Sequence, residues 1–96
     1  MEFFKKETKS ALEAIEYAQL IAHAPMVFQA SRVMRDNGIL QSVLDAGKKG
    51  ITLEGIVEKT GVPHYGVRVL VESGLGIGLL LFNEGKYTLT KTGYFI

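Results

Sequence analysis

The sequence predicts a mainly α-helical domain with one small β-hairpin, in the order of a winged helix-turn-helix preceded by a long N-terminal helix. Three observations support this fold class. No glycine or proline interrupts residues 1–24, so one long helix can form there. Residues 52–60, 61–63 and 64–73 follow the order helix, tight turn, helix. An apolar strand and an alternating strand then flank Asn83-Glu84-Gly85, which has the composition of a hairpin loop.

Length and composition predict one domain over residues 1–96, with the long helix at 1–24 and the winged helix at 26–96. An apolar fraction of 47% is ordinary for a globular protein. The absence of cysteine excludes disulfides and thiolate metal sites. No apolar run approaches the ~20 residues needed to span a bilayer, and no signal-peptide core follows Lys5 and Lys6. We therefore expect a cytoplasmic protein that does not enter a membrane.

The long N-terminal helix carries more apolar surface than one small domain can cover. Between positions 11 and 22 its polar residues, Glu13, Glu16 and Gln19, form one narrow stripe. A helix packed on one side of a domain shows an apolar arc of about 100° or somewhat more, and this helix is apolar over roughly twice that arc. It therefore needs partners on two sides, which in so small a chain indicates a second subunit or a missing domain. We predict a homodimer. The residues predicted at the subunit interface are Phe3, Phe4, Leu12, Ile15, Leu20, Ile21 and Met26.

Between this helix and the helix-turn-helix, turn-forming residues divide the chain into two further helices. Pro25 predicts a break, after which residues 26–35 form a second helix. Asn37-Gly38 predicts a helix stop, followed by a short third helix that begins at Ile39 and is ended by Gly47. Ile51 is then placed to pair with the wing. The side chains expected to point inward from the second helix are Met26, Val27, Ala30, Val33 and Met34.

Local signals mark the helix ends in the helix-turn-helix and the loop of its hairpin. Thr52 is a suitable N-cap, because its hydroxyl can accept a hydrogen bond from a free backbone N–H. Gly61 suits the position after the first helix, and Pro63 suits the first turn of the second. A three-residue hairpin loop is expected to place Gly85 at positive φ. Residues 93–96 are predicted to begin another helix.

The surface that would face DNA is poor in positive charge. The candidate contacts are His64, Tyr65, Arg68 and Lys86. On the second helix only Arg68 is reliably cationic, and residues 52–96 contain four basic and four acidic side chains. Because DNA affinity comes largely from neutralising phosphates, this balance argues against nucleic-acid binding. A small dimeric winged-helix transcription regulator remains the alternative interpretation.

No pattern in the chain indicates chemistry. Residues 74–78 match GxGxG, but a phosphate-binding loop follows a strand and opens a helix, with an acid about 20 residues further on. Here the run ends a helix, and no acidic residue follows Glu84. His23 and His64 stand at predicted helix ends, without a cysteine or an acid cluster that could complete a metal site. We therefore expect no catalytic residue and no metal ligand in this chain.

The order of hydrophobic segments and turns indicates a family. The long N-terminal helix is followed by Ala24-Pro25-Met26-Val27-Phe28 and by Gly38-Ile39-Leu40. The pattern continues through residues 52–57 and Gly61-Val62, and it ends with Tyr-Thr-Leu-Thr-Lys-Thr-Gly at residues 87–93. On these segments nearly the whole chain resembles the N-terminal domain of S-adenosylmethionine-dependent O-methyltransferases. The Leu-Thr-x-x-Gly ending is also common in winged-helix regulators.

The resemblance implies a domain that does no catalysis itself. In that family the winged-helix domain dimerises through interlocked N-terminal helices and lends a few side chains to the partner's substrate pocket. Methyl transfer from S-adenosylmethionine takes place in a C-terminal Rossmann-like domain. The resemblance thus implies a fragment that lacks this domain and has no cofactor of its own, with a small-molecule methyl acceptor bound through the missing part. Phe28 is a candidate for lining the substrate cleft. A stand-alone protein-interaction module is a third interpretation.

Overall fold

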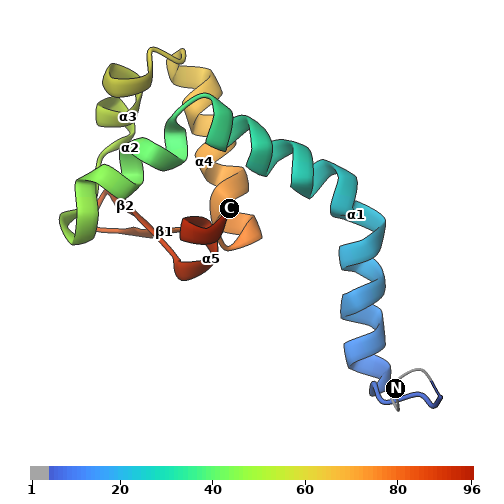
Figure 1. The fold of residues 1–96 in the computed structure, drawn as a ribbon. Coiled ribbons are helices and arrows are strands. Elements are labelled where there is room, and N and C mark those ends of the chain that lie inside the picture. The colour runs from blue at the N-terminus through green and yellow to red at the C-terminus, as the bar shows by residue number, and fades with distance from the viewer. Residues whose placement is uncertain (1–4) are drawn as a thin grey trace.

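The computed structural model describes residues 5–96 and confirms the predicted fold class, with one antiparallel hairpin among helices (Figure 1). A short 3₁₀ turn, η2, follows the second helix. In chain order the elements are α1 (Ala11–Asp36), α2 (Ile39–Ala46), η2 (Gly47–Lys49), α3 (Leu53–Thr60), α4 (His64–Ile77), β1 (Leu80–Asn83), β2 (Lys86–Leu89) and α5 (Lys91–Phe95).

Helix α1 differs from the prediction at its start and in its middle. Ser10 and Glu13 form a capping box, in which the Ser10 hydroxyl accepts from the Glu13 N–H at 3.2 Å, so the helix begins at Ala11. The predicted break at Pro25 is wrong, because α1 continues through this proline to Asp36. Proline removes one backbone hydrogen bond and kinks a helix without having to end it. Accordingly, the ribbon of α1 changes direction in its middle part (Figure 1).

The core lies where the last turns of α1 meet α2, α3, α4 and the hairpin. Met34 is fully buried as predicted, and it packs beside Gly74 of α4, where a β-carbon would crowd the Met34 sulfur and the Leu80 side chain. Met26 and Val33 were predicted to point inward, but both are exposed. Met26 is exposed because it lies before the final turns of α1, which pack on the core, whereas Val33 belongs to those turns but is partly exposed beside the buried Met34. The fully buried side chains are Met34, Ile39, Ile56, Leu79, Leu80, Val43, Val67 and Val71.

The first helix of the helix-turn-helix, α3, has the predicted ends. The Thr52 hydroxyl accepts a hydrogen bond from the Gly55 N–H at 3.1 Å, and Gly61 closes α3 with a φ of 73°. Pro63 takes the N-cap position of α4, one residue earlier than expected. Helix α4 is about one turn longer than predicted, and it reaches a left-handed Gly78. The glycine-rich run therefore ends a helix before a strand, as predicted, and has no phosphate-loop topology.

The hairpin loop contains two residues and not the three that were predicted. Asn83 pairs with Lys86, so only Glu84 and Gly85 connect the strands. Both have positive φ, at 51° and 78°, which is the conformation that matches a two-residue loop to the twist of its strands. The predicted pairing of Ile51 with the wing is confirmed. Its N–H donates to the Tyr87 carbonyl at 3.0 Å, and the Tyr87 N–H donates back at 2.8 Å.

The last helix, α5, confirms the prediction that another helix begins near Gly93. Thr90 anchors it, since its hydroxyl lies 2.7 Å from the Gly78 carbonyl oxygen and accepts from the Gly93 N–H at 3.0 Å. Gly93 is buried against the backbone of Leu79 and the side chain of Leu89. The end of α4, the end of β2 and the start of α5 are thus joined at one point.

Replacing Gly93 by alanine should destabilise the fold. The new β-carbon would collide with the Leu79 carbonyl oxygen, which is backbone and cannot turn away. We expect the free energy of unfolding, measured by urea titration, to fall by about 1–3 kcal/mol. Gly76→Ala is the matched control, because Gly76 lies within α4 and has open space around it. That variant should be neutral or more stable by up to about 1 kcal/mol. Equal losses in both variants would contradict the close packing at Gly93.

Tyr87 should make stability depend on alkaline pH. Burial, and secondarily the charges of Glu72 and Glu54, raise the pKa of its phenol above the usual value of about 10. The folded state therefore favours the neutral phenol, so this contribution is complete below pH ~10 and is lost as the pH rises through the folded pKa. As the pH rises above about 10, the free energy of unfolding should fall more steeply for the native chain than for Tyr87→Phe. If the free energy of unfolding, measured by urea titration, falls equally with pH in both proteins, the Tyr87 phenol is not responsible for the pH dependence.

Candidate dimerisation surface and helix-turn-helix face

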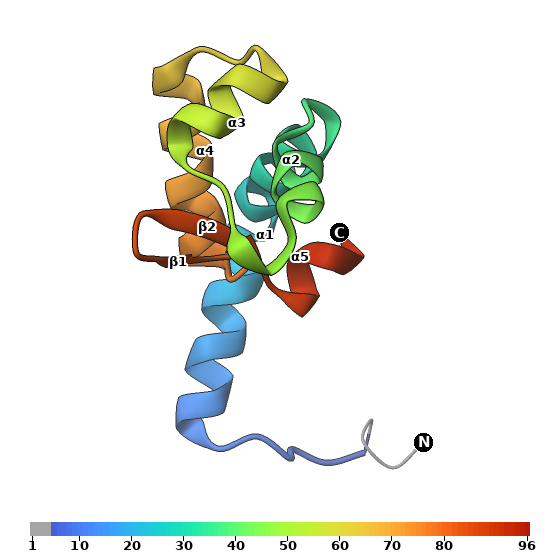
Figure 2. The ribbon, with the colours of Figure 1, turned by 90° about the vertical axis from the view of Figure 1, so that its left-hand side faces the viewer.

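The first half of α1 extends away from every other element in both views (Figures 1 and 2). The molecule measures 52 Å along its longest axis and only 24 and 22 Å along the others. The predicted interface residues of this half expose more than half of their surface each; they are Leu12, Ile15, Leu20 and Ile21. Phe3 and Phe4, predicted in the same interface, lie outside the described residues. A sizeable apolar helix surface is therefore uncovered in one copy of the chain.

The apolar surface of α1 continues into a groove against α4. This groove has a volume of about 280 Å³ and separates the middle of α1 from the last turns of α4. Its lining residues are His23, Met26, Val27, Ala30, Ser73 and Ile77. Met26, the last predicted interface residue, is 73% exposed and lies on the wall of the groove. The groove thus extends the uncovered surface toward the core.

Phe28, the candidate for a substrate cleft, also lies on α1 and is 58% exposed. It does not line the groove against α4. The structure therefore brings Phe28 to the surface without enclosing it in a cleft made by one copy of the chain.

His23 is bonded within its own helix, with Nδ1 lying 2.9 Å from the Gln19 carbonyl oxygen.

The helix-turn-helix face is exposed but carries little free positive charge. His64, Tyr65 and Arg68 are exposed on α4, and Lys86 is exposed at the start of β2. The Arg68 Nε lies 3.5 Å from the Glu72 Oε1, so the arginine predicted to contact DNA has an acidic neighbour on the same face. This exposed pair contributes little to stability, but the carboxylate would oppose an approaching phosphate.

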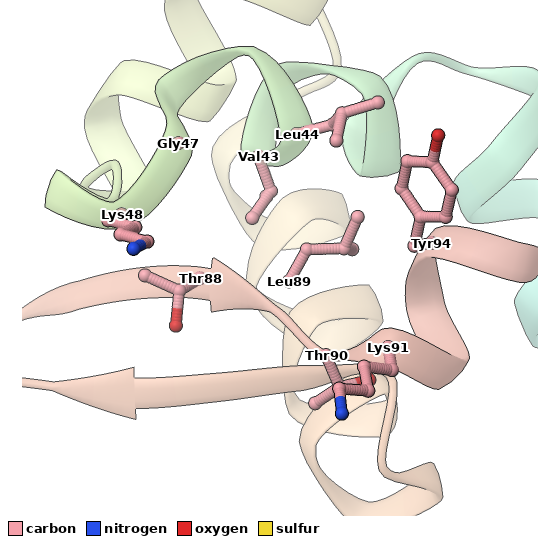
Figure 3. A pocket seen from close by; sticks show the side chains of 9 residues that line it. All are labelled: Val43, Leu44, Gly47, Lys48, Thr88, Leu89, Thr90, Lys91 and Tyr94. Carbon is pink, nitrogen blue, oxygen red and sulfur yellow. The ribbon is translucent and has the colours of Figure 1, made fainter.

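A second hollow involves residues that the sequence reasoning missed. It has a volume of about 440 Å³ and lies between α2, η2, β2 and α5 (Figure 3). Its lining residues are Val43, Leu44, Gly47, Lys48, Thr88, Leu89, Thr90, Lys91 and Tyr94. The charge count for the helix-turn-helix began at residue 52, so it left out Lys48 and Lys49, which the fold places beside the wing. The sequence signal that could have indicated them is their position directly before Gly50 and Ile51, because Ile51 was predicted to pair with the wing.

Among residues 5–96 no cluster of three or more His, Cys, Asp or Glu side chains is arranged to hold a metal ion. Within the same part of the chain, no helix combines the length and hydrophobicity required to cross a bilayer.

Comparison with known protein families places most of the chain in one family. Residues 16–87 match the Dimerisation2-like domain, and this match runs from α1 into β2 over most of the chain. The chain belongs to the Dimerisation2-like domain family. The predicted resemblance to the N-terminal dimerisation domain of O-methyltransferases is thereby confirmed. No curated protein matches the sequence.

The exposed face of α4 should not support tight binding to DNA. With Arg68 beside Glu72, too few cations are present for the 6–10 phosphate contacts of a typical specific complex. In a fluorescence anisotropy titration with a mixed-sequence duplex at low salt, we expect a Kd weaker than ~10 μM. Tighter binding that weakens steeply with added salt, and that is lost in Arg68→Gln, would instead support the transcription-regulator interpretation.

Proposed function

We propose that this chain is the dimerisation domain of an S-adenosylmethionine-dependent O-methyltransferase and that two copies associate through α1. The observation that supports this most directly is the projecting apolar half of α1, which no element of its own domain covers. Family membership supports it independently, because the matched domain is a dimerisation domain.

The free energy gained by burying the apolar side chains of α1 can be compared with the free-energy cost of association. Burying a large aliphatic side chain completely is worth about 1.5–3 kcal/mol, so each half-exposed residue of α1 can gain about 1 kcal/mol. The four described residues of this half, contributed by two copies, would together gain about 8 kcal/mol. This is comparable to the 4–15 kcal/mol that association costs in lost translational and rotational freedom. The groove beside Met26 is therefore proposed to be part of the interface, with α1 of one copy lying against the partner.

The catalytic steps belong to another domain in this proposal. The residues of this chain would hold the two copies together, while S-adenosylmethionine and the methyl acceptor would be bound elsewhere. Phe28 is proposed to contribute to the acceptor cleft of the partner, because it is an exposed aromatic side chain of α1 that lies outside the groove beside Met26. Reading the coding sequence beyond Ile96 tests this part. A strand, a glycine-rich turn and a downstream acid are expected there, and a reading frame without them would contradict the methyltransferase assignment.

Charge placed on the apolar face of α1 should separate the subunits. The double variant Ile15→Glu/Ile21→Glu would bury unpaired carboxylates at the proposed interface, and it should weaken dimerisation by about 100-fold or more. In light scattering and sedimentation velocity at ~100 μM, the native chain should be a dimer and the double variant a monomer. The variant should keep its core, since neither side chain contacts the rest of its own domain closely enough to be buried.

The control is Gln19→Glu, which adds one of the two negative charges of the double variant, but to the polar stripe of the same helix. This variant should remain dimeric. A native chain that is monomeric at ~100 μM, or a double variant that still dimerises, would refute the α1 interface.

A further inference from the structure

The hollow between α2, η2, β2 and α5, referred to as the wing hollow, has an apolar base. Side chains from different elements form this base, with Val43 of α2 pointing toward Leu89 of β2 and Tyr94 of α5 standing beside them (Figure 3). Leu44 is 40% exposed and Tyr94 is 62% exposed, so apolar surface at the hollow remains in contact with water. Its volume of about 440 Å³ lies within the ~300–1,000 Å³ usual for small-molecule sites.

The walls of the wing hollow are held in place by backbone contacts. Gly50 has a φ of 78°, and a β-carbon there would collide with Lys86 and the Tyr87 carbonyl oxygen, so η2 lies directly against the wing. The Ile51–Tyr87 bridge fixes the same junction. On the other side, Thr90 ties α5 to the end of α4. The hollow is thus formed by the fold itself.

Positive charge is concentrated at the rim. Lys48 and Lys91 line the wing hollow, and an adjoining depression that shares Lys48 and Thr88 is also lined by Lys49 and Lys86. Glu84 is the one acid lining either depression. Four cations against one acid contrast with a net charge of +1 for the whole chain. Within residues 5–96, none of these lysines forms an ion pair.

We propose that the wing hollow binds a small amphipathic anion, namely an aromatic or medium-chain carboxylate. Its apolar part would lie on Leu44, Leu89 and Tyr94, and its carboxylate would pair with an ammonium group at the rim, from Lys48 or Lys91. The Thr88 hydroxyl is available to donate to the same carboxylate, since no hydrogen bond engages it among the described residues. The Thr90 hydroxyl is not available, because it is already bonded to the backbone.

The apolar base favours this ligand over a nucleic acid. A phosphate backbone would use the lysines but would leave Leu44, Leu89 and Tyr94 without a partner. Four lysines also fall short of the 6–10 phosphate contacts of a typical DNA complex. A carboxylate joined to an apolar body can pair with a lysine at the rim and also cover the apolar side chains at the base. The wing hollow shares no residue with the proposed α1 interface, so ligand binding and dimerisation can fail separately.

The test is a titration of the ¹⁵N-labelled 96-residue chain with 2-naphthoate, followed by amide chemical shifts. We expect saturable shifts for Leu44, Lys48, Thr88, Leu89 and Tyr94. The uncharged analogue 2-naphthalenemethanol and the short anion acetate should each bind at least about tenfold more weakly. The first lacks the carboxylate, and the second lacks the aromatic body. In Lys48→Gln/Lys91→Gln the affinity for 2-naphthoate should fall by about tenfold or more.

Lys59→Gln is the control, because Lys59 is exposed and does not line the wing hollow. It should leave the affinity unchanged. Shifts confined to α1, equal binding of the uncharged analogue, or equal loss of affinity in the control would overturn the proposal. So would tighter binding of a DNA duplex at the same amides, which would identify the lysines as a nucleic-acid surface. A monomeric chain that still binds 2-naphthoate would refute the α1 interface and leave this proposal standing.

Discussion

The attachment of α1 by its last turns alone is the constraint on which the architecture depends. Met34 is buried where α1 packs against α2 and α4, at a point where Gly74 leaves just enough room for its sulfur. From there the helix runs back through Pro25 and away from the domain. A surface that would be core in a larger protein is thereby left in water. No described element of this chain covers it, and an uncovered helix agrees with the dimerisation family to which the chain belongs.

The proline inside α1 sets the direction in which the first half of the helix leaves the domain. Because Pro25 lacks an N–H, one helical hydrogen bond is missing there, and a kink can form without ending the helix. The projecting half therefore leaves the domain at a different angle from the anchored half (Figure 1). A straight helix would direct its apolar face elsewhere, so the kink determines which surface a partner meets.

The helix-turn-helix and its wing form the compact part of the molecule. Their glycines are placed where the chain turns or where two backbones approach, as at Gly61 and Gly93. The exposed face of α4 offers one arginine, and Glu72 lies beside it. Positive charge gathers instead around η2 and the wing, above the apolar hollow that is proposed to bind an amphipathic anion.

The sequence by itself determined the local structure of this protein. Thr52, Gly61 and Asn37-Gly38 act through bonds and φ angles within a few residues, so the ends of the short helices could be predicted. The width of the apolar arc on α1 likewise depends only on helical periodicity. Tertiary structure decided whether Pro25 ends or kinks its helix, because packing of the turns after it against α2 and α4 outweighs one lost hydrogen bond. It also decided that Lys48 lies beside the wing, since that contact joins segments nearly forty residues apart and no local pattern encodes it.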